Sequence, residues 1–193
     1  MLFRSRFLYA VNETDRWQGQ PGGYVTAFAI QGADGSLREL NQQSAGGAAP
    51  CHLTIDRSGR CVLAANYTGG STVVLPVHSD GSLRPRSMLV QHKGSSVNPS
   101  RQKEPHAHSV NLSPDGRFAY VADLGTDRVY IHRFDPVAGT LAPAVPDSVA
   151  LPPGSGPRHF AFGPDGRRAF VINEILSTLT GFTVDRETGA LTS

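Results

Sequence analysis

Two histidines, two arginines and one glutamate are the residues of this sequence whose types and positions could do chemistry. His106 and His108 lie two residues apart on an extended segment and so share a face. A neutral imidazole, with an unperturbed pKa of about 6.5, suits general-base work. Arg158, and Arg101 in a polar loop, suit the binding of a carboxylate or phosphate, and Glu174 a catalytic or hydroxyl-binding role. These groups indicate acid–base chemistry on a small anionic molecule.

Each of these residues also has a structural interpretation, and the sequence leaves both open. The two histidines could form the polar start of a strand. As a metal pair they would need a third ligand, and no short cluster of Cys, His, Asp or Glu supplies one nearby, so we predict no metal and no cofactor. Arg158 could be a surface residue of a tight turn, and Glu174 could accept hydrogen bonds from backbone amides of the turn that follows it.

The usual local signatures of catalysis are absent from the sequence. It contains no Walker loop, dinucleotide-binding glycine motif, nucleophile elbow, zinc-protease helix or Cys-x-x-Cys motif. Gly154-Ser-Gly156 is too short to count as a phosphate-binding loop. Any chemistry must therefore be assembled from segments far apart in the chain, and the elements that bring them together matter most.

One segment of the sequence recurs four times, each time as an arginine followed by an apolar run. The arginines are 54, 57 and 50 residues apart, and a period of this size indicates a repeat architecture. The copies are Arg6-Phe-Leu-Tyr-Ala-Val-Asn-Glu13, Arg60-Cys-Val-Leu-Ala-Ala-Asn-Tyr67, Arg117-Phe-Ala-Tyr-Val-Ala-Asp-Leu124 and Arg167-Arg-Ala-Phe-Val-Ile-Asn-Glu174.

Short strands joined by tight turns fill each repeat. In the third, Ser109-Val-Asn-Leu112, Phe118-Ala-Tyr-Val-Ala122 and Val129-Tyr-Ile-His-Arg-Phe134 read as strands, with a fourth expected near Leu141. Four antiparallel strands per unit predict an all-β fold, a β-propeller of four-stranded blades without helices. We expect one partial propeller domain with blade units at roughly 1–50, 51–104, 105–156 and 157–193.

The polar residues gather just before the innermost strand of each unit. Innermost strands of a propeller line its channel, so these segments should meet at one mouth; they are Pro50-Cys-His52, Pro105-His-Ala-His108 and Gly156-Pro-Arg-His159. We add His159 to the substrate-binding candidates, and Arg101 from the insertion at 91–104, because loops on a rigid scaffold often carry binding residues. A second set that recurs in every blade is better explained by the fold: Asn12, Asn66, Asp123 and Asn173.

Composition narrows the possible partners and compartment. Lys+Arg 18 against Asp+Glu 16 is too balanced to suggest a nucleic-acid or membrane surface. No apolar run reaches the roughly 18 residues needed to cross a bilayer, and the first residues do not read as a secretory signal. We expect Cys51 and Cys61 to be reduced, buried thiols, which fits a cytoplasmic protein.

Several ordered motifs carry a resemblance to a known family. They are Arg101-Gln102, Glu104-Pro-His-Ala-His-Ser109, Asp123-Leu-Gly-Thr-Asp127, Gly154-Ser-Gly-Pro-Arg-His159, and Asn173-Glu174 followed by Ser177-Thr178. The chain resembles the lactonase family of seven-bladed propellers, which includes bacterial 6-phosphogluconolactonase and fungal carboxymuconate cyclase. The resemblance implies a metal-independent, cytoplasmic enzyme of carbohydrate metabolism. It also implies a catalytic histidine at His106 or His108, a substrate-binding arginine at Arg158 and an acidic site residue at Glu174.

The resemblance also implies a length. Seven blades of roughly 50 residues need around 350, so we expect about four of seven blades here, with a further site arginine of the family beyond Ser193. Our first hypothesis is a lactone hydrolase of the 6-phosphogluconolactonase type, and the alternative within the family is cycloisomerisation of a carboxymuconate. A non-catalytic propeller scaffold is the alternative from another class; it would leave His106, His108, Arg158 and Glu174 scattered.

Overall fold

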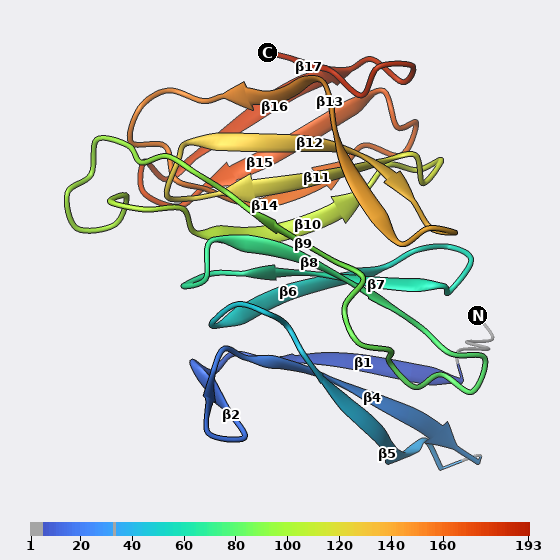
Figure 1. The fold of residues 1–193 in the computed structure, drawn as a ribbon. Helices are drawn as coiled ribbons and strands as arrows, with labels where there is room; N and C mark the ends of the chain where they lie inside the picture. Colours follow the sequence, from blue (N-terminus) through green and yellow to red (C-terminus); the bar gives the residue numbers. More distant parts are fainter. Residues whose placement is uncertain (1–5, 33) are drawn as a thin grey trace.

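The computed structural model describes residues 6–32 and 34–193, in which every regular element is a β-strand and no helix occurs. The strands form antiparallel sheets that lie side by side in chain order, from the sheet of β1 to the sheet of β14 (Figure 1). The all-β propeller architecture predicted from the repeat is confirmed. Among the described residues, no helix is long and apolar enough to span a membrane.

Three of the four main sheets have four strands, and the first has three. The first contains β1 (Phe7–Asn12), β4 (Tyr24–Gln31) and β5 (Ser36–Ser44), with a small hairpin of β2 (Arg16–Trp17) and β3 (Gln20–Pro21) beside it. The second contains β6 (Pro50–Ile55), β7 (Cys61–Asn66), β8 (Ser71–Pro76) and β9 (Met88–Gln91). The third contains β10 (Ala107–Leu112), β11 (Phe118–Asp123), β12 (Arg128–Asp135) and β13 (Thr140–Ala150). The fourth contains β14 (Pro157–Phe162), β15 (Arg168–Asn173), β16 (Thr178–Val184) and β17 (Leu191–Thr192).

The apolar runs of the repeat become strands that are buried on both faces. In β7, Leu63 packs towards the third sheet, whereas Val62 and Ala64 pack towards the first. Successive side chains of a strand point to opposite faces, so a strand between two sheets has to be apolar throughout. β15 differs, because Phe170 and Ile172 on its outer face are 39% and 54% exposed. Each pair of neighbouring sheets thus has its own hydrophobic core.

The turns that precede β7, β11 and β15 share one conformation. Gly59, Gly116 and Gly166 have φ of 69°, 75° and 66°, a left-handed backbone that glycine adopts without steric cost. This explains why the glycine recurs in the predicted turns. The shared turn sets the start of each of these strands, and so the position of the residues at their far ends.

Candidate active site at the start of the inner strands

β6, β10 and β14 come first in their sheets, and β10 contacts both of the others. Each has a β-bulge at its start, where the pairing register shifts between Pro50 and His52, Ala107 and Ser109, and Pro157 and His159. The residue omitted from each ladder is Cys51, His108 and Arg158, respectively. A bulged residue is unpaired and its side chain is re-aimed. We call this region, where the three bulged residues lie, the inner-strand mouth.

A glutamate shared by two arginines forms the charged part of the site. Oε1 of Glu174 accepts a hydrogen bond of 2.7 Å from Nη2 of Arg101, and Oε2 lies 2.8 Å from Nη1 of Arg158. Burial alone would raise the pKa of Glu174, but the hydrogen bond and charge of Arg101, with the charge of Arg158, outweigh it and hold the pKa below its ordinary value. Among the described residues the carboxylate accepts no hydrogen bond from a backbone amide, which one interpretation of the sequence allowed; it pairs with both guanidinium groups and sets their geometry.

Tyr67 connects these arginines to the histidine pair. Its hydroxyl accepts a hydrogen bond of 3.1 Å from Nη2 of Arg101. Its ring stacks on His106 at a centroid distance of 4.6 Å and meets the edge of His108 at 5.5 Å. Sequence reasoning missed Tyr67, although a signal was present: it follows Asn66 as Glu174 follows Asn173, so the two occupy equivalent positions in their repeats.

The two histidines have different surroundings. Nδ1 of His106 lies 3.1 Å from the carbonyl oxygen of Tyr67, and because a carbonyl oxygen only accepts, Nδ1 is the donor in this contact. Nδ1 of His108 is buried and has no hydrogen-bond partner among the described residues. Burial, followed by the charge of Arg158, lowers the pKa of His108 to about 4, which keeps its imidazole neutral at physiological pH.

His159 lies at the rim of the cluster of rings. Its ring centroid is 5.2 Å from that of His108 and 5.9 Å from that of His52. Burial and the charge of Arg158 lower the pKa of His159. All the residues singled out from the sequence, His106, His108, Glu174, Arg158, Arg101 and His159, are therefore joined by contacts that run through Glu174, Tyr67 and His108.

Asp123, a member of the recurring Asn and Asp set, holds the backbone next to the histidine pair in place. Its Oδ1 accepts hydrogen bonds from the backbone amides of His106, Gly125 and Thr126, and its Oδ2 lies 2.7 Å from Nδ1 of the buried His92. In the second and fourth sheets the equivalent asparagines donate to neighbouring hydroxyl or carbonyl groups. In these three sheets the contacts of the set are structural, and in the third sheet they fix the backbone of a candidate histidine.

Cys51, the bulged residue of the second sheet, adds no reactive thiol. Its Sγ lies 3.3 Å from the carbonyl oxygen of His108, and burial raises the pKa of its thiol to about 12. Cys51 and Cys61 are both free cysteines. Across residues 6–32 and 34–193, no group of three or more His, Cys, Asp or Glu side chains is placed to hold a metal ion.

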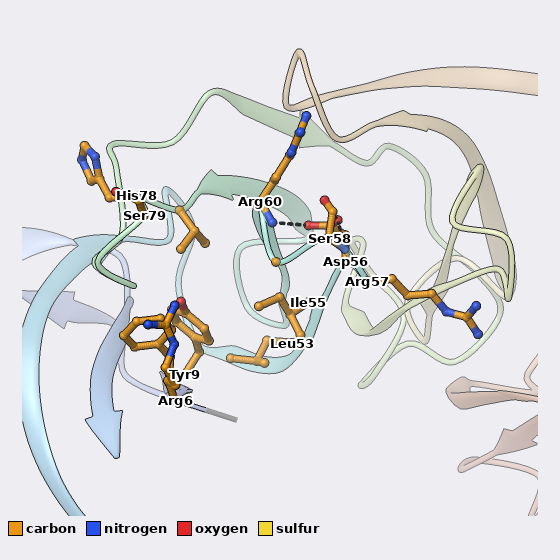
Figure 2. A pocket seen from close by; sticks show the side chains of 13 residues that line it. Arg6, Tyr9, Leu53, Ile55, Asp56, Arg57, Ser58, Arg60, His78 and Ser79 are labelled. Atoms are coloured by element: carbon orange, nitrogen blue, oxygen red, sulfur yellow. Dashed lines mark hydrogen bonds between the residues drawn. The ribbon is translucent and has the colours of Figure 1, made fainter. Parts of the chain in front are cut away.

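A hollow of about 990 Å³ lies elsewhere in the molecule (Figure 2). It lies between β1 and β6 and includes Asp56 and Arg57, which follow the opposite end of β6 from the inner-strand mouth. Its charged groups do not converge: Figure 2 shows Arg57 directed away from Arg6 and Arg60. Asp56 accepts hydrogen bonds only from its own turn, at Ser58, Arg60 and Cys61, as far as the described residues show. The polar cluster at the inner-strand mouth, where opposite charges and rings meet, therefore remains the candidate active site.

Fold and site together define a β-propeller with a polar cluster of two arginines, one glutamate and stacked rings at the start of its inner strands. The chain belongs to the lactonase family of seven-bladed β-propellers. The family model described as "Lactonase, 7-bladed beta-propeller" matches residues 2–193. The 6-phosphogluconolactonase of Bacillus subtilis is 36% identical over 168 residues, which are 87% of this chain and 45% of that protein. The 6-phosphogluconolactonase of Formosa agariphila is 31% identical over 93% of this chain and 50% of its own length.

Solved structures agree with these relatives. The periplasmic gluconolactonase of Pseudomonas aeruginosa matches with a TM-score of 0.88 and 37% identity, over 96% of this chain and 52% of that one. The chain thus spans about half the length of the relatives it matches.

Proposed function

We propose that the protein is a lactone hydrolase of the 6-phosphogluconolactonase type, and that the inner-strand mouth is part of its active site. One observation carries the proposal: two arginines from different parts of the chain share Glu174 beside a histidine that burial keeps neutral. Anion-binding groups and a base thus occur together. The names of the relatives from Bacillus subtilis and Formosa agariphila supply the substrate class.

His108 is our candidate for the general base. It occupies the same bulge position in its sheet as Arg158 does in the next, and its pKa responds to the charges of both Arg158 and Glu174. In the proposed reaction it removes a proton from water as the water oxygen attacks the lactone carbonyl carbon. The ring C–O bond then breaks, the proton passes to the departing alkoxide, and an open-chain hydroxy acid results. His106 would line the site and fix Tyr67 by stacking.

Arg158 and Arg101 would bind the anionic part of the substrate or the developing oxyanion. Two guanidinium groups against one carboxylate leave an excess positive charge at the site. A dianionic phosphate can bind to guanidinium nitrogens that Glu174 leaves free, without breaking the existing pairs. Glu174 keeps both guanidinium groups oriented before the substrate arrives, which reduces the cost of ordering them. His159 would complete the rim of the same anion site.

Single substitutions in the protein at its natural length test the assignment. We expect His108→Ala to reduce kcat for 6-phosphogluconolactone by roughly 100-fold or more, the usual contribution of a general base, and His106→Ala to reduce it far less. Turnover is followed as acid release after subtraction of spontaneous hydrolysis. Unchanged turnover in His108→Ala would remove this base from the mechanism. Preferential turnover of a carboxymuconolactone would instead point to the other activity of the family.

The compartment is part of the proposal. We infer a cytoplasmic enzyme because Cys51 and Cys61 are both free thiols, as is usual for a reducing compartment. Fractionation of cells that produce the natural protein tests this, since enrichment in a periplasmic or secreted fraction would contradict it.

A further inference from the structure

A single buried carboxylate outside the cluster is hydrogen-bonded to both segments that carry its arginines. Asp127, in the turn between β11 and β12, is 4% exposed. Its Oδ1 accepts hydrogen bonds from Nε2 of Gln102 at 2.8 Å and the amide of Gly156 at 2.7 Å. Its Oδ2 accepts from Oγ of Ser96 at 2.5 Å and the amide of Gly154 at 2.6 Å. Charge-assisted hydrogen bonds of this kind are among the strongest that a buried carboxylate makes.

The first connection runs through Gln102 to Arg101. Gln102 is fully buried, and both the nitrogen and the oxygen of its side-chain amide form hydrogen bonds. Besides Asp127, its Nε2 donates to the carbonyl of Leu124 at 2.9 Å, and its Oε1 accepts from the amide of Asn98 at 3.1 Å. Arg101 is the preceding residue. The direction in which it leaves the backbone, towards Tyr67 and Glu174, is therefore set by a side chain that Asp127 holds in place.

The second connection runs through Gly156 to Glu174 and Arg158. The carbonyl oxygen of Gly156 accepts a hydrogen bond of 2.7 Å from the amide of Glu174, and Arg158 follows two residues later. Gly156 has a φ of 64°, and a Cβ there would lie 2.6 Å from the side chain of Ile175. Only glycine therefore fits this position, where its amide meets Asp127 and its carbonyl meets Glu174.

We propose that Asp127 is a positioning residue for the site, which fixes Arg101 through Gln102, and Glu174 and Arg158 through Gly156. Among the described residues, its carboxylate makes no hydrogen bond to the side chains of Arg101, Arg158 or Glu174. Its effect on turnover rests on the proposed function, whereas its effect on the geometry of the charged residues does not. Groups that orient binding residues in this way commonly matter as much as the residues they orient.

Asp127→Asn is the direct test, with Asp56→Asn as its control. Asparagine keeps the shape of the side chain but replaces one acceptor oxygen with a donor, which would face the donors on that side. Asp56 is 6% exposed and, like Asp127, accepts two hydrogen bonds on each oxygen, but within a turn at the opposite end of β6. The control therefore loses comparable hydrogen bonding without any connection to the site.

The first readout is the pKa of Glu174, measured by carbon-13 NMR of labelled protein, and needs no substrate. In Asp127→Asn the pairing of Arg101 and Arg158 with Glu174 should weaken, and the pKa of Glu174 should rise. In Asp56→Asn the pKa of Glu174 should stay as in the wild type. An unchanged pKa in folded Asp127→Asn would overturn the proposal. If Asp127→Asn does not fold, Gln102→Met gives the same test for Arg101 alone, and its failure to move the pKa of Glu174 would overturn the connection through Gln102.

The second readout is kinetic. We expect Asp127→Asn to lower kcat/KM for 6-phosphogluconolactone by about 10-fold to 100-fold, mostly through KM, because displaced arginines bind the anion poorly. Asp56→Asn should stay within about twofold of the wild type while losing thermal stability. If Glu174 responds but the wild-type protein hydrolyses no lactone, the proposed function fails and the positioning role stands. Equal kinetic losses in both variants would show that Asp127 acts only on stability.

Discussion

Glu174 is the residue on which the local electrostatics of the site depend. It bridges Arg101 and Arg158, whose side chains remain 42% and 44% exposed. Ion pairs this exposed contribute little to folding stability, because water screens them. Their value lies in geometry: Glu174 orients both guanidinium groups, Tyr67 also accepts a hydrogen bond from Arg101, and each group has further N–H donors that could bind a ligand. The cluster is better explained by binding than by stability.

Tyr67 offers a way to test the anion site one hydrogen bond at a time. Tyr67→Phe removes one of the two acceptors for Nη2 of Arg101 and leaves Glu174 as the other, while it keeps the ring that stacks on His106. We expect KM for the phosphorylated lactone to rise about fivefold, as expected for the loss of one hydrogen bond worth about 1 kcal/mol, with kcat within about twofold. Steady-state kinetics provide the measurement.

Tyr24→Phe is the matched control for this change. Tyr24 stacks on Trp17 beside the first sheet, outside the site. It should leave both kinetic constants unchanged. If Tyr67→Phe also leaves KM unchanged, Arg101 does not contribute to anion binding through this contact.

The surroundings of His108 predict the pH dependence of the reaction. The base has to be neutral, and burial with the charge of Arg158 lowers its pKa to about 4. We therefore expect kcat/KM to stay level as the pH falls through 6.5 and to decline only near pH 4. A rate profile corrected for spontaneous hydrolysis measures this. A decline centred near pH 6.5 would contradict the assignment of a base whose pKa is lowered to about 4.

The β-bulge is the element that turns a repeated strand into a site. β6, β10 and β14 share one pairing pattern, and in each the residue left out of the ladder is presented at the inner-strand mouth. The fold needs the bulge but not a particular side chain there, so the position is free to carry Cys51, His108 or Arg158. The bulge makes Ala107, rather than Pro105, the equivalent of Pro50 and Pro157, and thereby separates the roles of His106 and His108.

At the scale of the whole molecule, the site needs the packing of neighbouring sheets. Tyr67 directly follows β7 of the second sheet, His108 lies in β10 of the third, and Glu174 directly follows β15 of the fourth. Polar groups also lie within the interfaces. His132 of β12 is 5% exposed, and neither ring nitrogen has a hydrogen-bond partner among the described residues. Its ring lies 6.4 Å from that of His92, between the second and third sheets.

His132 should make the folded protein sensitive to acid. Burial, then the charge of His92, lowers its pKa to about 4. Between pH 6.5 and 4 the unfolded chain therefore binds a proton at this histidine that the folded chain does not bind. Its contribution to stability is complete above pH 6.5 and is lost as the pH falls towards 4, on the order of 2 to 3 kcal/mol. Urea unfolding between pH 7 and 4 should show a shallower loss in His132→Leu than in the wild type.

The exposed His78 is the control for this prediction. His78→Leu should keep the pH dependence of the wild-type unfolding free energy. The same slope in His132→Leu and the wild type would mean that other groups cause the acid sensitivity.

The sequence alone determined the fold and indicated most residues of the proposed site, and the tertiary structure determined the contacts between them. A strand between two sheets has to be apolar on both faces, and the turn before it has to contain glycine. The residue types and their spacing in the sequence therefore reveal the repeat. Hydrogen bonds between sheets leave no such local pattern. The sequence therefore indicated His106, His108, Arg158 and Glu174 but not Tyr67, and it did not distinguish the two histidines. Tyr67 and the different surroundings of the two histidines follow from the bulge and the packing of the sheets, because these set which side chains share a space.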